Sequence, residues 1–260
     1  AMPSNVEIGL PRAVGLITLF CPQTKAPICI MDGQVISAIR TGAISALAAK
    51  KIVPTRVTSV GLIGAGVNMR TQLLGISHVL PNLKKVYVYS RFETKFDFAK
   101  SMSRLTGLEI IPVSSPEEAI INQQFIITCL PNGVQPVVKD QWLPKTGMTI
   151  FNIGGHEVEE TVLSRMDRII ADVWEHAKTR ASQTHAKAFF KEIIKEDQIE
   201  NLAPLLVNEV KGRVSDEQNI FFCPTGLGFS DAIIAQRVFE CAKKLNLGQK
   251  IIQWDDSRWI

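Results

Sequence analysis

Two glycines in residues 59–69, SVGLIGAGVNM, have the type and spacing that most directly suggest chemistry. Gly64 follows a short apolar run and would make a tight turn, and Gly66 would let the backbone approach a pyrophosphate at the start of the next helix. The unpaired N–H groups and the dipole of a helix N-terminus favour negative charge there. The strict dinucleotide fingerprint has a third glycine where this chain has Met69, so an ordinary strand-to-helix turn is the alternative.

The next apolar run, Lys85–Tyr89, ends about where a βαβ unit binds the ribose of a dinucleotide, and it is followed by Ser90 and Arg91. An Asp or Glu at this place would bind both ribose hydroxyls and repel a 2′-phosphate, whereas a hydroxyl and a cation can bind phosphate. We therefore predict NADP(H) as the preferred cofactor and NAD(H) as the alternative. A solvated loop without a ligand would also contain such residues.

The composition of the 260 residues is that of a globular protein with a sizeable core, because 46% are apolar and the formal net charge is only +4. The basic residues are scattered, so neither nucleic acid nor a membrane surface is an expected partner. The five cysteines lack the spacing of metal ligands, so we expect no metal and buried free thiols in a reducing cytoplasm.

The elements that must position the glycines follow from the apolar pattern. Residues 14–20 and 27–31 predict a hairpin, and small and apolar residues at helical spacing predict a long helix over residues 35–52. From residue 59 on, apolar runs alternate with helical segments, as in a parallel sheet whose ligands bind beyond the carboxyl ends of the strands. The candidate site segments that follow the predicted strands are residues 90–91, 128–132 and 152–157.

The second half of the chain is less informative. Residues 179–211 are rich in charges and predict an amphipathic helix. Residues 219–223 predict a strand, after which Pro224, Thr225 and Gly226 turn into a helix over about residues 230–245, with Asp231 or the serine before it as a cap. Arg40 lies alone in the long helix, where a solvated position or an internal ion pair is the usual role.

The order of these motifs resembles that of a known family. A GLPR hairpin is followed by MDG, by the Arg-Thr pair within ISAIRTGAISALAAK, by GLIGAG and by a Pro-Thr-Gly turn that opens a helix containing Asp231. Over nearly all of its length the chain resembles the ornithine cyclodeaminase/mu-crystallin family. The resemblance implies an α/β fold in which a Rossmann-type doubly wound parallel sheet, residues 55–223, is inserted in a smaller α+β substrate and dimerisation domain, residues 1–54 plus 224–260.

The resemblance also implies chemistry at the α-carbon of an amino or imino acid, and it assigns site residues. Arg40 would bind the substrate carboxylate and Thr225 would lie near the substrate. His156 and Asp231 are the other predicted catalytic residues. The predicted cofactor contacts are Arg12, Thr41, Gly64, Gly66, Val67, Asn68, Ser90, Arg91, Thr128, Leu130, Ile153, Gly154, Gly155 and Pro224.

Three departures from the family pattern bear on the reaction. The family's proton-transferring lysine lies upstream of the GLPR hairpin, so we expect the smaller domain to be N-terminally incomplete and the chain by itself to be weakly dimeric and a poor catalyst. His156 stands where cyclodeaminases have an aspartate, and Glu160 where they have a lysine. These two changes weaken the case for cyclodeamination and leave hydride transfer intact. A hydrogen bond within its own loop is the alternative for His156.

We therefore predict an NADP(H)-dependent oxidoreductase acting on the C–N bond of a small amino or imino acid, of the ketimine reductase or amino-acid dehydrogenase type. This type includes the N-substituted glutamate dehydrogenase of siderophore-precursor synthesis. One alternative is an ornithine or lysine cyclodeaminase, an ammonia-lyase that uses NAD catalytically, and another is a non-catalytic, crystallin-like NADPH-binding protein. The expected partners are the small substrate and, when the protein is complete, a second copy in a homodimer.

Overall fold

The structure is a computed structural model that describes residues 2–131 and 133–252, and it separates into two compact units. One unit comprises Ala1–Ser37 with Gly228–Ile260, and the other Ala38–Leu227. The domain limits expected from the sequence, at residues 54/55 and 223/224, stay a prediction. Residues 253–260 of the expected smaller domain lie outside the described residues.

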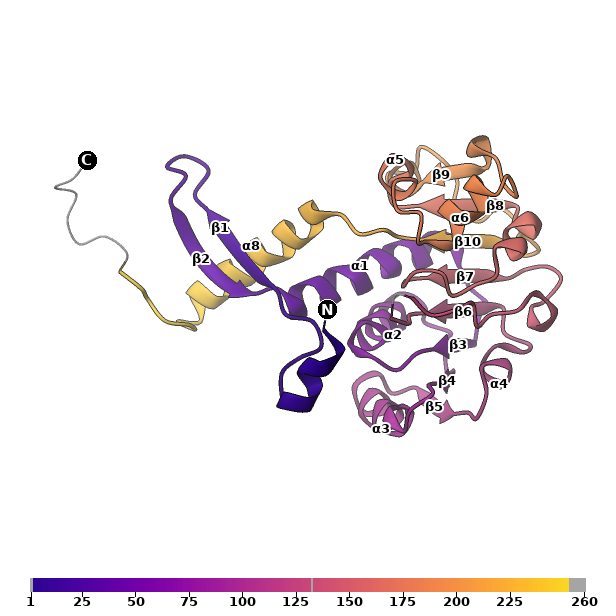
Figure 1. The fold of residues 1–260 in the computed structure, drawn as a ribbon, viewed down its shortest axis with the longest axis horizontal. Coiled ribbons are helices and arrows are strands. Elements are labelled where there is room, and N and C mark those ends of the chain that lie inside the picture. Colours follow the sequence, from indigo (N-terminus) through magenta and orange to yellow (C-terminus); the bar gives the residue numbers. More distant parts are fainter. Residues whose placement is uncertain (1, 132, 253–260) are drawn as a thin grey trace. The chain divides into compact units, whose positions relative to one another are not determined.

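The larger unit is built on an eight-stranded sheet in which every pair of neighbouring strands is parallel (Figure 1). The strand order is β5-β4-β3-β6-β7-β10-β8-β9, so the chain winds outward from β3 in one direction and then returns to its other side. This reversal at β3 is the place where open parallel sheets bind ligands. The strands are β3 (Ser59–Ile63), β4 (Lys85–Tyr89), β5 (Glu109–Pro112), β6 (Phe125–Thr128), β7 (Thr149–Asn152), β8 (Arg168–Ala171), β9 (Ile199–Asn201) and β10 (Ile220–Cys223).

Both faces of this sheet are covered by buried apolar side chains, as the continuous apolar runs of its central strands require. Along β6, Phe125 and Ile127 belong to one core while Ile126 belongs to the other, because successive side chains of a strand point to opposite faces. In β10, Phe222 and Phe221 divide in the same way. The arrangement confirms the predicted Rossmann-type, doubly wound parallel sheet.

The helices contribute to these two cores in separate groups. The first core takes residues from α1, α2, α3 and α7, and the second from α4, the 3-10 helix η3 and α6. None of the described helices combines the length and apolar character needed to cross a bilayer. The elements are α1 (Gln34–Ile52), α2 (Val67–Val79), α3 (Thr94–Thr106), α4 (Pro116–Ile120), α5 (Trp174–Ala177), α6 (Thr184–Phe190), α7 (Leu202–Leu206), η2 (Asp140–Trp142), η3 (Glu160–Arg165) and η4 (Glu196–Gln198).

The prediction of an amphipathic helix over residues 179–211 is wrong. This stretch folds as α6, then η4, then the edge strand β9, then α7. Glu192 and Asn208 adopt positive φ values of 57° and 65°, which interrupt a helix, and Pro204 lies in the first turn of α7, where a missing N–H costs least. The three residues of β9 pair with β8, a contact far along the chain that local periodicity does not report.

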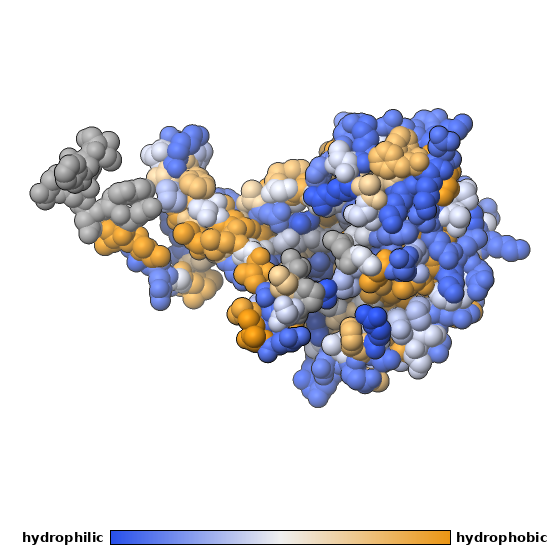
Figure 2. All heavy atoms as spheres, viewed as in Figure 1, coloured by the Kyte–Doolittle hydropathy of each residue, from blue (hydrophilic) through white to orange (hydrophobic). Residues whose placement is uncertain are grey.

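The smaller unit contains η1 (Pro3–Ile8), the antiparallel hairpin of β1 (Leu16–Phe20) and β2 (Pro27–Asp32), and α8 (Gly228–Lys244). Helix α8 contacts β1, so the hairpin packs on the C-terminal helix. Apolar side chains remain exposed on the hairpin and the helix of this unit (Figure 2), Leu16, Phe20, Ile30, Phe229 and Ile233 among them. The homodimer stays a prediction.

Candidate dinucleotide and substrate site

The predicted glycine turn lies at the carboxyl end of β3, at the reversal of strand order. Gly64 has a φ of +114°, in the left-handed region that favours glycine, and its N–H donates a 2.8 Å hydrogen bond to the carbonyl oxygen of Tyr89. A Cβ at Gly64 would clash with the carbonyl oxygen of Cys129, just beyond β6. The close approach of the two chain segments therefore requires glycine at this position.

Gly66 is the N-cap of α2, and it has the room that a ligand needs. A Cβ built on it would meet no heavy atom within 4 Å, and no side chain caps the helix. Gly66, Val67 and Asn68 are exposed, so the first N–H groups of α2, which have no partner within the helix, face open space. This is the geometry that fits a pyrophosphate.

Met69 explains how the turn forms without a third glycine. Its side chain is fully buried and belongs to the core between α2 and the sheet. The third glycine of the fingerprint serves close packing of helix on strand, which is a different task from binding phosphate. The departure at Met69 therefore changes the packing under α2 and leaves the ligand side of the turn intact.

Ser90 and Arg91 lie at the end of β4, as the sequence predicts, but their side chains are placed differently. Ser90 is 8% exposed, and its Oγ accepts a 3.3 Å hydrogen bond from the N–H of Phe92. Arg91 is exposed, with its guanidinium 5.2 Å from the centre of the Phe92 ring. Of the two side chains, Arg91 is therefore the one free to approach a ribose phosphate.

Glu157, within the predicted segment 152–157 but not among the predicted site residues, joins the loops that follow β6 and β7. Its buried carboxylate accepts hydrogen bonds from the Thr128 hydroxyl, from the N–H of Leu130 and, at 3.4 Å, from the N–H of Gly154. Burial raises the pKa of Glu157 to about 7, although these hydrogen bonds act in the opposite direction. A Cβ at Gly154 would clash with this carboxylate, so glycine is needed at position 154.

The neighbouring predicted contacts are mostly backbone groups on the same two loops. The carbonyl oxygen of Gly155 accepts hydrogen bonds from Asn152 Nδ2 at 2.7 Å and from Thr184 Oγ1 at 3.3 Å, and Ile153 is nearly buried. The structure thus holds these loops together at one edge of the sheet. Asn132, within the predicted segment 128–132, lies outside the described residues.

The turn after β10 contacts Arg40, and both belong to the same unit as the glycine turn. Gly226 has a φ of +88° and donates its N–H to Asp172 Oδ2 at 2.7 Å. A Cβ at Gly226 would lie 2.6 Å from Nη1 of Arg40, so the guanidinium rests directly against this turn. Arg180 Nη1 donates to the carbonyl oxygen of Thr225 at 3.2 Å, and Gln183 contacts both Thr225 and the carbonyl oxygen of Pro224.

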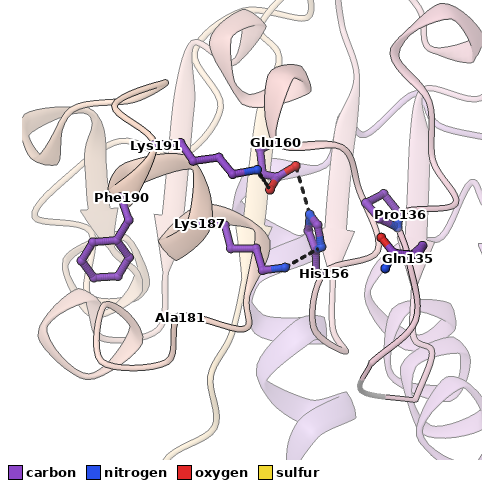
Figure 3. A pocket seen from close by; sticks show the side chains of 8 residues that line it. All are labelled: Gln135, Pro136, His156, Glu160, Ala181, Lys187, Phe190 and Lys191. Atoms are coloured by element: carbon purple, nitrogen blue, oxygen red, sulfur yellow. Dashed lines mark hydrogen bonds and ion pairs between the residues drawn. The ribbon is translucent and has the colours of Figure 1, made fainter.

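His156 lies in a chain of charged groups (Figure 3). Its Nδ1 is 2.8 Å from Lys187 Nζ, and its Nε2 is 3.1 Å from Glu160 Oε2, at an angle poor for a hydrogen bond. Glu160 also pairs with Lys191 at 2.6 Å. Burial would raise the pKa of Glu160, but hydrogen bonds from Lys191 and from its own backbone N–H, together with the nearby His156 ring, outweigh burial and lower it to about 2.

The remaining predicted residues are distributed between the two units. Thr41 follows Arg40 in α1, within the larger unit, whereas Arg12 and Asp231 belong to the smaller one. The roles of all three stay predictions. Among the described residues, no group of three or more His, Cys, Asp or Glu side chains could hold a metal ion.

A strand-to-helix glycine turn at the reversal of a doubly wound sheet is typical of Rossmann-type proteins, and comparison with known proteins defines the family. The sequence model of the ornithine cyclodeaminase/mu-crystallin family matches residues 1–246. The chain therefore belongs to this family.

Individual relatives and solved structures are also similar to the chain. The chain is 27% identical over 241 residues to N-((2S)-2-amino-2-carboxyethyl)-L-glutamate dehydrogenase of Staphylococcus aureus, covering 92% of this chain and 71% of the relative. The solved structure of Thermococcus litoralis Delta(1)-pyrroline-2-carboxylate reductase with NADH and L-proline matches with a TM-score of 0.87 at 30% identity, over 96% of this chain and 78% of that one. A lysine cyclodeaminase structure matches with a TM-score of 0.82 at 25% identity, over 96% and 72%.

Proposed function

We propose that this protein is a nicotinamide-dependent oxidoreductase that acts on the C–N bond of a small amino or imino acid. The observation that carries the proposal is Arg40, whose guanidinium rests against Gly226 in the same unit as the glycine turn. A planar, two-pronged cation suits an α-carboxylate, which every amino or imino acid substrate has. The S. aureus dehydrogenase and the T. litoralis reductase support the same class of reaction.

The residues of the chain would bind and orient both reactants. The N–H groups at the start of α2 would hold the pyrophosphate, and the loops joined by Glu157 would hold the rest of the dinucleotide at the carboxyl edge of the sheet. Arg40 would fix the substrate through its carboxylate, and Asp172 and Arg180 keep the turn beside it in place. A bound nicotinamide supplies or accepts the hydride.

A cyclodeaminase is the second candidate, because a lysine cyclodeaminase structure also matches the chain. Cyclodeamination requires several proton transfers within one bound intermediate, which in cyclodeaminases depend on the aspartate that His156 replaces. Here Lys187 Nζ faces Nδ1 of His156, so the imidazole accepts a hydrogen bond and carries no fixed negative charge. Net redox chemistry is the better fit to these residues.

Two parallel incubations of the full gene product separate the candidates. One contains ornithine with a catalytic amount of NAD(P), and the other a cyclic ketimine carboxylate with NADPH. We expect NADPH absorbance to fall in the second incubation and no ammonia to form in the first. Accumulation of ammonia and proline from ornithine, without net change in cofactor absorbance, would favour the lyase.

We further propose that NADPH binds more tightly than NADH. The 2′-phosphate carries about two negative charges, and one charge-assisted contact with Arg91 is worth roughly 1.5–3 kcal/mol, so a preference of about tenfold or more is expected. Titration of tryptophan fluorescence with both cofactors measures it, and Arg91→Ala should remove it. Arg104→Ala, at the far end of α3, is the matched control. Equal dissociation constants in the unmodified protein would contradict the proposal.

A further inference from the structure

A pocket of about 510 Å³ opens beside His156, and the functions described so far do not use it (Figure 3). We call it the Lys187 pocket. Its walls come from the segment after β6, from the loop after β7, from η3 and from α6 with the loop before it. The lining residues are Gln135, Pro136, His156, Glu160, Ala181, Lys187, Phe190 and Lys191.

The charges that face this pocket leave one ammonium group without a counter-charge. Lys191 is paired with Glu160 at 2.6 Å, which neutralises both. The described residues offer the Lys187 ammonium one hydrogen-bond partner, the Nδ1 lone pair of His156. Because that nitrogen accepts the hydrogen bond, the ring proton lies on Nε2, toward Glu160. The pocket therefore has a net charge of about one positive unit, centred on a half-buried lysine.

The position of His156 fixes where this ammonium points. An ammonium has three donors, and one of them is occupied by Nδ1 of His156, which leaves two for a ligand in the pocket. The amide side chain of Gln135 lines the pocket with Lys187, from a different segment. One cation with two donors, assisted by a neutral amide, suits a single carboxylate.

The pocket also adjoins the turn after β10, against which the Arg40 guanidinium rests. Ala181 lines the pocket, while its neighbours Arg180 and Gln183 bind the carbonyl oxygens of Thr225 and Pro224. The next residue of that turn, Gly226, lies against the Arg40 guanidinium. A substrate held by Arg40 through its α-carboxylate therefore has a second cationic site one loop away, within the same unit.

We propose that Lys187 binds a second carboxylate of the substrate, so that the preferred substrates are acidic amino or imino acids, with that carboxylate on the side chain or on a substituent of the nitrogen. His156 is then a positioning residue that orients the Lys187 ammonium. The assignment rests on the proposed function for the reaction at the α-carbon, but the binding of the second carboxylate can be measured without turnover.

The test uses pairs of amino acids that match in carbon chain and differ in the distal carboxylate. These are L-aspartate with L-2-aminobutyrate, L-glutamate with L-norvaline, and L-2-aminoadipate with L-norleucine, a series that also covers different distances between the two carboxylates. Oxidation by NADP⁺ gives kcat/KM, and calorimetry gives the affinity of the cofactor-loaded protein. In at least one pair we expect the acidic member to be favoured about tenfold or more.

Two variants locate the effect. Lys187→Met should lower kcat/KM and affinity for the favoured acidic member about tenfold and leave its uncharged counterpart within about twofold. Lys191→Met removes an equal charge, already paired with Glu160, and should preserve the preference. A separate arm adds sodium acetate as a competing anion. If acetate competes equally with the acidic and the uncharged member of a pair, the anion site is unrelated to the second carboxylate.

The outcomes distinguish this proposal from the proposed function. Equal affinity for acidic and uncharged members, or equal loss of both in Lys187→Met, overturns the assignment of Lys187 even if amino acids are oxidised. Preferential binding of the acidic member that Lys187→Met abolishes supports the assignment, even if none of the six amino acids is oxidised. In that last case the proposed function, and not the pocket, would need revision.

Discussion

Replacing Arg40 by lysine is expected to raise KM for the amino- or imino-acid substrate by about ten- to a hundredfold, because a point charge replaces a two-pronged contact worth roughly 1.5–3 kcal/mol. The change keeps the positive charge beside Gly226, so the protein should still fold and bind its cofactor. Steady-state kinetics at saturating NADPH measure the effect, and urea unfolding checks the fold.

Arg56→Lys is the matched control for this substitution. Arg56 forms a surface ion pair with Asp216 at 3.0 Å, and both side chains are about half exposed. Exposed pairs contribute little, so KM should stay within about twofold of the unmodified protein. If Arg40→Lys behaves like Arg56→Lys, Arg40 serves an internal ion pair and not the substrate.

The second large effect concerns Glu157 and pH. Burial raises the pKa of this carboxyl from 4.5 to about 7 in the folded protein. Because the pKa of Glu157 is higher in the folded protein, its protonation stabilises the fold. This contribution to the unfolding free energy is fully present below the unfolded-state pKa of 4.5 and is lost as the pH rises through about 7. The total change corresponds to about 3 kcal/mol of unfolding free energy.

Glu157→Gln removes this titration while an amide can still accept from the N–H of Leu130 and donate to the Thr128 hydroxyl. Relative to the variant, the unmodified protein should lose about 2 kcal/mol of unfolding free energy between about pH 5 and pH 8. Urea unfolding followed by tryptophan fluorescence gives both curves. The exposed Glu109, paired with Lys85 at 3.2 Å, supplies the control Glu109→Gln, whose curve should parallel that of the unmodified protein.

The titration of His185 changes the unfolding free energy with pH in the opposite direction, so its effect must be separated from that of Glu157. Burial lowers its pKa to about 4, against the effect of Asp172, so its contribution is lost as the pH falls from 6.5 through about 4. Because Glu157→Gln retains His185, the difference between the two proteins cancels this effect. Parallel curves for Glu157→Gln and the unmodified protein would show that folding does not raise the pKa of Glu157.

The sequence was sufficient for the features that depend on local pattern. The apolar run before Gly64 and the alternation of runs with helical segments predicted the parallel sheet, since a strand buried on both faces needs such runs. The place of Arg91 after β4 followed from the regular length of a βαβ unit. Strand β9 was missed because its three residues depend on pairing with β8 and not on their own periodicity.

Contacts between distant residues could not be predicted from one sequence. Glu157 binds Thr128, 29 residues away, and His156 binds Lys187, 31 residues away. From the sequence, His156 either replaces the aspartate of cyclodeaminases or forms a hydrogen bond within its own loop, and neither interpretation predicts a contact with a lysine on α6. The position of Glu157 in a site loop, directly before the apolar Val158, was the available signal that it is buried.

The central claim is net hydride transfer between the nicotinamide and the α-carbon of an amino or imino acid. Its most direct measurement is the mass of the amino acid formed when the full gene product reduces a cyclic ketimine carboxylate with NADPH that carries deuterium at both positions of C4. We predict one deuterium on the α-carbon of each product molecule and one cofactor oxidised for each product formed. Product without deuterium, or ammonia released from ornithine while the cofactor returns unchanged, would contradict the account.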